Sequence, residues 1–305
     1  MSATWDLLVV GDANPDVVVS GAPADPPWGH RERLVDAGAL TLGGSAAITA
    51  CGAARLGLRT AFAGRVGDDP AGRFCLDALR ERGVDVTGCV IDPDRPTALT
   101  VVLASGGDRA MLTAPGCLPF HRPDDLDPGL VAAARHVHVS SYFLQPRLAA
   151  ALPAWFAGLR AAGATTSLDT NDDPSGAWDS PVTAAIARTD VFLPNEAEAL
   201  ALTGTDDVGA AAEKLAASAG LVVVKRGAAG ALAWTGDGPV TVAAHPVTPV
   251  DTVGAGDSFN AGFLAGRLGG LDLAGSLRLA AACGALSTRA AGGTAAQPTL
   301  AEARA

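Results

Sequence analysis

Runs of basic residues are absent from this chain of 305 residues, and their absence excludes one class of partner. The formal net charge at pH 7 is −10, because 22 Lys and Arg stand against 32 Asp and Glu. A polyanion such as a nucleic acid would be repelled by this charge rather than attracted. We therefore expect a small-molecule ligand and no nucleic-acid partner.

Long hydrophobic runs and paired cysteines are missing as well. No stretch approaches the roughly 18 consecutive apolar residues that a membrane span requires, and the N-terminal "MSATWDLLVVGD" lacks the basic and apolar regions of a signal peptide. The five cysteines include no Cys-x-x-Cys pair, which favours reduced thiols over a disulfide framework. These absences predict a soluble cytoplasmic protein with no membrane partner.

The common phosphate-binding motifs are also absent. The chain contains no Gly-x-x-x-x-Gly-Lys-Ser/Thr sequence, and the run Gly254-Ala255-Gly256 lacks the third glycine of the dinucleotide-binding motif and lies far from the first strand. A Walker-type nucleotidase and a nicotinamide-dependent oxidoreductase are therefore poorly supported.

What the sequence does contain is an alternation of short apolar runs and alanine-rich helical patterns. Examples are "DLLVVGD" at 6–12, "GSAAITACGAARLG" at 44–57 and "TAFAGRVG" at 60–67. This rhythm is typical of βαβ units. We predict an α/β fold in which a doubly wound, mostly parallel central sheet is flanked by helices, with residues 1–305 forming a single domain.

Two stretches depart from that rhythm. Residues 14–42 are rich in Val, Pro and Gly, and "PTALTVVLASGGDRAMLT" at 96–113 alternates like a hairpin around Gly106-Gly107. We expect the two stretches to form a small β-sheet that projects from the body as a lid.

The stretch "DTVGAGDSFNAGFLAG" at 251–266 concentrates glycines in front of a helical pattern. Glycines at 254 and 256 allow a sharp turn and the close approach of a ligand. Since the helix begins near Asp257, the turn lies at a helix N-terminus, which favours an anion such as phosphate. Asp257 is then either a general base for a hydroxyl that attacks phosphorus or a helix cap, and the spacing alone leaves both open.

This stretch resembles the C-terminal signature of the ribokinase-like (PfkB) carbohydrate kinase family. Further matches follow in the family's order: "GDANPD" at 11–16, "GGSAAITACGAARLG" at 43–57, "AGRVGDDPAG" at 63–72, "RGVDV" at 82–86, "LDTN" at 168–171, "PNEAE" at 194–198 and "VVVKRGAAGA" at 222–231. The resemblance covers nearly the whole chain. It implies ATP-dependent phosphorylation of a hydroxymethyl group of a small sugar.

The resemblance also implies roles at the transfer site. Asp257 would act as the base on the substrate hydroxyl, and the backbone amides of Gly254, Ala255 and Gly256 would stabilise the transferring phosphoryl group. These assignments make Asp257 more than a cap.

On the nucleotide side, the resemblance implies that Asn195 and Glu198 organise Mg²⁺ through its waters. It also implies that Lys225, Gly227 and Gly230 line the ATP site. The competing readings are that Glu198 is a solvated helix residue and that Lys225 makes a surface ion pair.

On the acceptor side, Asn14, Asp16, Gly43 and Gly44 match the family's sugar-binding positions, and Asp169 and Asn171 are weaker candidates. Asp251 matches the position that supports a potassium loop in potassium-activated members, although a turn-forming aspartate explains it equally well.

Two alternatives stay open. Ile48 replaces the family's usual asparagine, so that it and apolar lid residues could face the base of a nucleoside, and the chain would then be a nucleoside kinase. A non-catalytic sugar sensor would require a lost base, which is not seen. Lid sheets in the family often pair between subunits, so a homodimer is expected.

Overall fold

The computed structural model describes residues 4–26, 28–105, 108–178 and 181–305. Within them an eight-stranded sheet has the order β14-β13-β12-β11-β10-β9-β1-β4. Six strands are parallel, and β13 and β14 add an antiparallel edge. The bounds are β1 Leu7–Val10, β4 Thr60–Ala63, β9 His136–Val139, β10 Thr165–Leu168, β11 Val191–Phe192, β12 Leu221–Lys225, β13 Ala231–Thr235 and β14 Gly238–Val242.

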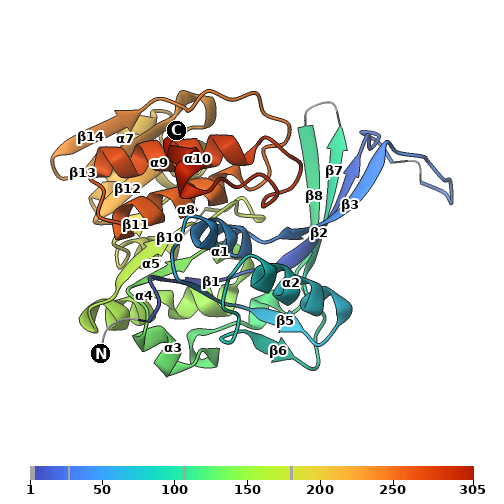
Figure 1. Ribbon diagram of the computed structural model, residues 1–305, viewed down its shortest axis with the longest axis horizontal. Coiled ribbons are helices and arrows are strands. Elements are labelled where there is room, and N and C mark those ends of the chain that lie inside the picture. The colour runs from blue at the N-terminus through green and yellow to red at the C-terminus, as the bar shows by residue number, and fades with distance from the viewer. Residues whose placement is uncertain (1–3, 27, 106–107, 179–180) are drawn as a thin grey trace.

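Helices cover both faces of this sheet, as Figure 1 shows. Within β1, Leu7 and Val9 enter one core while Leu8 and Val10 enter the other, because successive side chains of a strand point to opposite faces. This double burial requires a continuous apolar run. The predicted doubly wound fold is thereby confirmed.

Each core is closed by its own set of helices. The first core contains residues of α1 Ser45–Arg55, α2 Pro70–Glu81, α8 Ala255–Leu268, α9 Leu273–Ser287 and α10 Leu300–Arg304. The second contains residues of α3 Pro128–Ala132, α4 Pro146–Ala161, α5 Val182–Ile186, α6 Glu196–Thr203 and α7 Val208–Ala216. No helix of the described residues has the length and apolarity that crossing a membrane requires.

A second sheet projects from the body, at the right of Figure 1. Its order is β3-β2-β7-β8, with β2 parallel to β7 and the other pairs antiparallel. Its strands are β2 Asn14–Ser20, β3 Ala37–Gly43, β7 Leu99–Ser105 and β8 Asp108–Ala114, which fall in the two stretches that the sequence set apart. The predicted turn at Gly106-Gly107 lies outside the described residues.

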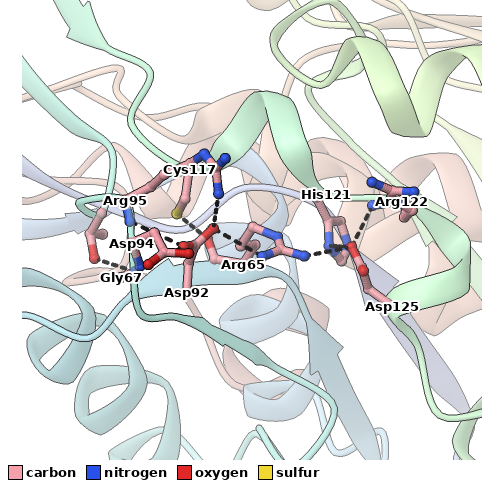
Figure 2. Close-up of polar contacts among 10 residues, drawn as sticks. Arg65, Gly67, Asp92, Asp94, Arg95, Cys117, His121, Arg122 and Asp125 are labelled. Atoms are coloured by element: carbon pink, nitrogen blue, oxygen red, sulfur yellow. Dashed lines mark hydrogen bonds and ion pairs between the residues drawn. The ribbon is translucent and has the colours of Figure 1, made fainter.

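A buried ion-pair network fastens the small parallel sheet of β5 Arg65–Gly67 and β6 Val90–Asp92 to a neighbouring segment. Arg65 lies between two carboxylates in Figure 2, 3.0 Å from Asp92 and 2.9 Å from Asp125. Asp92 is only 1% exposed and also accepts the backbone N–H groups of Asp94 and Arg95. The network joins segments 60 positions apart in sequence through a group that cannot lose its charge.

Candidate functional site

Polar side chains gather at the carboxyl ends of the parallel strands. Asp12 follows β1, Asp169 follows β10, and Lys225 is the last residue of β12. The helices α1 and α8 begin at this same edge, where their first residues, Ser45 and Ala255, lie near these groups. Ligands of open α/β sheets collect at this edge, and helix N-termini add positive dipole ends to it.

Asp257 lies in the first turn of α8 and is 7% exposed. Gly254 is the N-cap residue, in the left-handed region at φ 71°, and no side chain makes a capping hydrogen bond to this helix. Asp257 is therefore not the N-cap residue, but it lies in the first turn, where a carboxylate also stabilises the helix dipole, so its role as a base stays a prediction.

The backbone is packed tightly at one glycine of this turn and loosely at the other. A Cβ atom on Gly254 would lie 2.6 Å from the Cα of Gly293 and 3.1 Å from the Cγ2 of Ile48. On Gly256 it would lie 3.6 Å from the Nζ of Lys225, an ordinary contact. Ile48, which is buried, thus supports the turn from one side, while the Lys225 ammonium lies on the other.

The electrostatic surroundings of Asp257 favour proton uptake. Burial raises the pKa of this carboxyl well above its usual 3.8, and the nearby charges of Asp169 and Asp12 raise it further. Lys225 and a hydrogen bond from Ser45 oppose the shift. The carboxylate is consequently a stronger base than an exposed aspartate.

Lys225 and Asp169 form a buried ion pair. Asp169 is fully buried, and the same oxygen accepts the Nδ2 of Asn260 at 2.5 Å. Burial acts to lower the pKa of Lys225, but the charges of Asp169, Glu198 and Asp257 outweigh it and raise that pKa. Lys225 therefore keeps its charge inside the site, and the reading as a surface ion pair is wrong.

Asn195 and Glu198 close on each other at the start of α6. The Nδ2 of Asn195 donates to Glu198 Oε1 at 2.6 Å, its backbone N–H donates to Oε2 at 2.8 Å, and the Glu198 N–H returns a bond to Asn195 Oδ1 at 2.9 Å. Glu198 is 5% exposed, which overturns its reading as a solvated helix residue. Burial, followed by the charge of Asp169, raises its pKa to about 7.

The donor set suits a magnesium ion held largely by other ligands. The described residues contain no group of three His, Cys, Asp or Glu side chains placed to hold a metal. A carboxylate offers about four lone-pair sites, of which Glu198 uses two in the contacts above. Mg²⁺ commonly keeps its waters and takes phosphate oxygens, so Glu198 fits a water-mediated contact.

A cavity of about 510 Å³ opens beside Lys225. Gly227 lines it at φ 50°, and a Cβ atom there would meet nothing within 4 Å. Gly230, at φ 85°, is required by the fold, since a Cβ atom would overlap the carbonyl of Val242 on β14. The rest of the cavity wall is mostly small and apolar, with Gly256, Phe259, Ala281, Gly284 and Ala285, but it also includes Arg226, His245, Thr252 and Thr288.

Asn14 and Asp16 lie at the start of β2 and do not line this cavity. The Nδ2 of Asn14 donates to Asp16 Oδ1 at 2.7 Å and to Thr100 Oγ1 at 3.1 Å. A Cβ atom on Gly43 would overlap the Asp16 carboxylate, so glycine makes room for that group. Gly44, at φ 92°, begins the turn into α1. The predicted acceptor residues therefore converge.

Comparison with known proteins decides the family. The model of the pfkB family carbohydrate kinases matches residues 6–300. The chain belongs to the pfkB carbohydrate kinase family.

Curated relatives in the family include a fructokinase of Klebsiella pneumoniae, 37% identical over 84% of this chain and 88% of the relative. An ATP-dependent ribose-1-phosphate kinase of Halopiger xanaduensis is 34% identical over 80% of this chain and 79% of the relative. The structure of Arabidopsis thaliana ribokinase complexed with ribose and ATP superposes with a TM-score of 0.88 at 25% identity, covering 100% of this chain and 98% of that one. This pfkB chain is thus a phosphotransferase with an alcohol acceptor that phosphorylates sugars with ATP.

Three residues of this pfkB site escaped the sequence reasoning. The Asp12 carboxylate accepts the N–H groups of Ser45 and Ala46 at 3.1 and 3.0 Å, so it caps α1 from the end of β1. Ser45 in turn accepts the Nδ2 of Asn171 at 2.8 Å. Asn260 bonds Asp169, one turn into α8. A carboxylate directly after a buried strand, as in "LLVVGD", was the available signal for Asp12.

Asp251 joins the turn that precedes α8 to the loop around Gly292. It accepts the N–H of Val253 at 3.0 Å and that of Gly292 at 2.8 Å, and Arg109 of β8 lies 3.9 Å away. Both carboxylate oxygens are engaged and a guanidinium already supplies positive charge. Two hydrogen bonds do not use all the lone pairs of a carboxylate, so the potassium-loop role expected for Asp251 stays a prediction.

A groove of about 1440 Å³ lies at the opposite edge of the sheet. It runs along the amino ends of β9, β10, β11 and β12 and is bounded by Trp155, Leu264 and Leu268. It contains none of the candidate residues named above, because these follow the carboxyl ends of the strands.

Proposed function

We propose that the chain transfers the γ-phosphoryl group of ATP to a hydroxymethyl group of a small sugar, with Asp257 as the general base. One observation carries this proposal: a buried carboxylate of raised pKa lies in the first turn of α8, beside a glycine turn that faces the Lys225 ammonium. The apolar cavity includes Ala255 and Gly256 of that turn and none of the proposed acceptor residues.

The transfer step follows from the position of Asp257. The carboxylate takes the proton of the sugar hydroxyl while an oxygen electron pair forms the new bond to phosphorus. The bond between the γ-phosphorus and its bridging oxygen breaks, and ADP leaves with that electron pair. A raised pKa serves this step because it brings the basicity of Asp257 closer to that of a hydroxyl being deprotonated.

Charge on the transferring group is met by the start of α8. The first N–H groups of a helix have no intrahelical acceptor, and the helix dipole adds positive potential there. The backbone at Gly254, Ala255 and Gly256 lies at this helix start, although the Ala255 N–H also donates to the carbonyl of Thr252 at 3.3 Å, and Lys225 adds a full charge beside Gly256. Fixed donors of this kind stabilise a developing anion without reorganisation.

The nucleotide side is completed by Asn195, Glu198 and the cavity beside Gly227. Magnesium, when bound, supplies neutralisation of the phosphate charge, and Asn195 and Glu198 would hold its waters. The small apolar wall of the cavity suits an adenine ring.

The projecting sheet serves as a lid in this proposal, because β2 and β3 carry the acceptor residues at their body ends. Closure would exclude water, which otherwise competes as acceptor.

The projecting sheet also exposes large apolar side chains. Leu40, Met111 and Leu112 expose 55%, 56% and 61% of their surface on this sheet. Exposed apolar groups on one sheet support a homodimer formed through the lids. A monomeric mass in light scattering at assay concentration would contradict it.

A sugar is favoured over a nucleoside as the acceptor because the Ile48 side chain is buried by packing contacts. It packs against Gly254 and Gly293 and is 3% exposed, so it offers no open face to a nucleobase. A coupled ADP assay with ribose, fructose, adenosine and pseudouridine separates the two classes. Turnover confined to the nucleosides would reverse this order.

The base assignment is tested with Asp257→Asn. We expect this variant to bind ATP with unchanged affinity and to lose at least about 100-fold in kcat, the usual contribution of a general base. The matched control is Asp272→Asn, which alters the N-cap aspartate of α9, bonded to the Gly275 N–H. This control should lower stability and leave transfer intact. Wild-type turnover by Asp257→Asn refutes the proposed role.

A further inference from the structure

The acceptor end of the site is enclosed by buried carboxylates. Asp12, Asp16 and Asp257 are exposed by 3%, 4% and 7%. Burial raises the pKa of each, to about 7 for Asp16, and the charge of Asp12 contributes to the shifts of the other two. Since the charge of Asp12 disfavours a negative charge on Asp16 and on Asp257, it would likewise disfavour an anionic acceptor placed beside them.

The basic groups near this edge are committed elsewhere. Lys225 is paired with Asp169 and lies on the nucleotide side of the turn, by Gly256. Arg109 lies 3.2 Å from the hydroxyl of Thr252 and 3.9 Å from Asp251. Lys214, the other lysine of the chain, donates to the carbonyl of Thr203.

The partners of the acceptor carboxylates are uncharged. Asp12 accepts backbone N–H groups at the start of α1, and Asp16 accepts the amide of Asn14, which also bonds Thr100. Thr100 continues to Thr113 at 3.0 Å. Hydroxyl, amide and carboxylate groups of this kind exchange hydrogen bonds readily with sugar hydroxyls. They offer no counter-charge to a second phosphate or to a sugar carboxylate.

We propose that the acceptor is an uncharged polyhydroxy compound and that Asp12 and Asp16 exclude phosphorylated sugars and sugar acids. The inference rests on the proposed kinase function and narrows its substrate class. The proposal also favours one of two relatives that have similar sequence identity to this chain. The fructokinase is named for a neutral acceptor, whereas the ribose-1-phosphate kinase is named for a phosphate ester. The chain then performs the first phosphorylation of a free sugar.

The experiment compares acceptors that share a free hydroxymethyl group and differ in charge. Fructose is compared with both fructose 1-phosphate and fructose 6-phosphate, so that one phosphate leaves the acceptor hydroxyl free whichever end is used, and ribose is compared with ribose 1-phosphate, in a coupled ADP assay at fixed ionic strength. Like charges brought together in a desolvated site cost binding steeply, so we expect the neutral member of a used pair to have kcat/KM at least about 100-fold higher. A ratio within about tenfold overturns the inference and leaves the kinase assignment standing.

Two variants locate the origin of the ratio. Asp16→Asn removes the charge and keeps the shape, and it should narrow the neutral-to-anionic ratio by about tenfold even if kcat/KM for the sugar also falls. Asp77→Asn, an exposed position on α2, changes the net charge equally and should leave the ratio unaltered. Equal ratios in Asp16→Asn and the wild type overturn the role of that carboxylate. Absence of transfer to acceptors of both charge classes sinks the proposed function itself.

Discussion

The two glycines that flank Ala255 give opposite predictions when each is replaced by alanine. Gly254 has φ 71° and no room, since its Cβ atom would approach Gly293 to 2.6 Å. The left-handed conformation costs an alanine about 1–2 kcal/mol, and forcing atoms into a packed region costs about 1–3 kcal/mol more. Gly254→Ala should therefore lower the free energy of unfolding by about 2–5 kcal/mol.

Gly256 lies inside α8 with only ordinary contacts, so alanine there should stabilise by about 0.5–1 kcal/mol. The assay is urea unfolding of both variants. If the free energy of unfolding falls by about 3 kcal/mol per M urea, the urea concentration at the unfolding midpoint should fall by about 0.7–1.7 M in Gly254→Ala. Its kcat should fall as well, because the displaced turn carries the amides that meet the phosphoryl group. A Gly254→Ala midpoint within about 0.2 M of wild type refutes this reasoning.

Three further predictions concern buried charge. Arg65→Met removes the guanidinium that joins Asp92 to Asp125 and leaves Asp92 with only Arg95, 3.4 Å away, as a cation, so it should destabilise by up to about 3–5 kcal/mol. Arg80→Met at the exposed pair with Asp77 should stay within about 1 kcal/mol in the same urea assay. Burial lowers the pKa of His138 to about 4, so this histidine stays neutral in the folded chain while it is protonated below about pH 6.5 in the unfolded chain. The free energy of unfolding should therefore fall as the pH drops from about 6.5 to about 4. His138→Gln should reduce the slope of that free energy against pH by about 1.4 kcal/mol per pH unit in this range, measured by urea unfolding at several pH values. Because the pKa of Asp257 is raised, kcat/KM should fall on acidification with a midpoint well above 3.8, and a pH profile flat down to that value contradicts the base.

The sequence was sufficient for the features that local patterns determine. Alternating strand and helix patterns predicted the doubly wound sheet, because a strand buried on both faces must be continuously apolar. The glycines of 251–266 placed Asp257 at a helix N-terminus, and α8 begins at Ala255 as the turn requires. These predictions needed only neighbouring residues.

The sequence could not predict contacts between residues that are far apart in the chain and meet only in the folded structure. The pairing of Lys225 with Asp169 joins side chains 56 positions apart, and whether Lys225 is buried depends on α8 covering it. The packing of Ile48 against Gly254 and Gly293 likewise arises where α1 meets α8. Ile48, which the sequence allowed to face a nucleobase, is instead buried against the turn before α8.

The strands of the projecting sheet begin and end at residues that we propose to bind the acceptor. Asn14 is the first residue of β2, Gly43 is the last residue of β3, and the two are paired, so a rigid tilt of the sheet would move both together. A partner that binds the far end of the sheet and favours one tilt would change the affinity for the sugar, and by thermodynamic reciprocity a bound sugar would change the affinity for that partner by the same factor. In a dimer formed through these sheets, sugar binding to one subunit would then change the sugar affinity of the other.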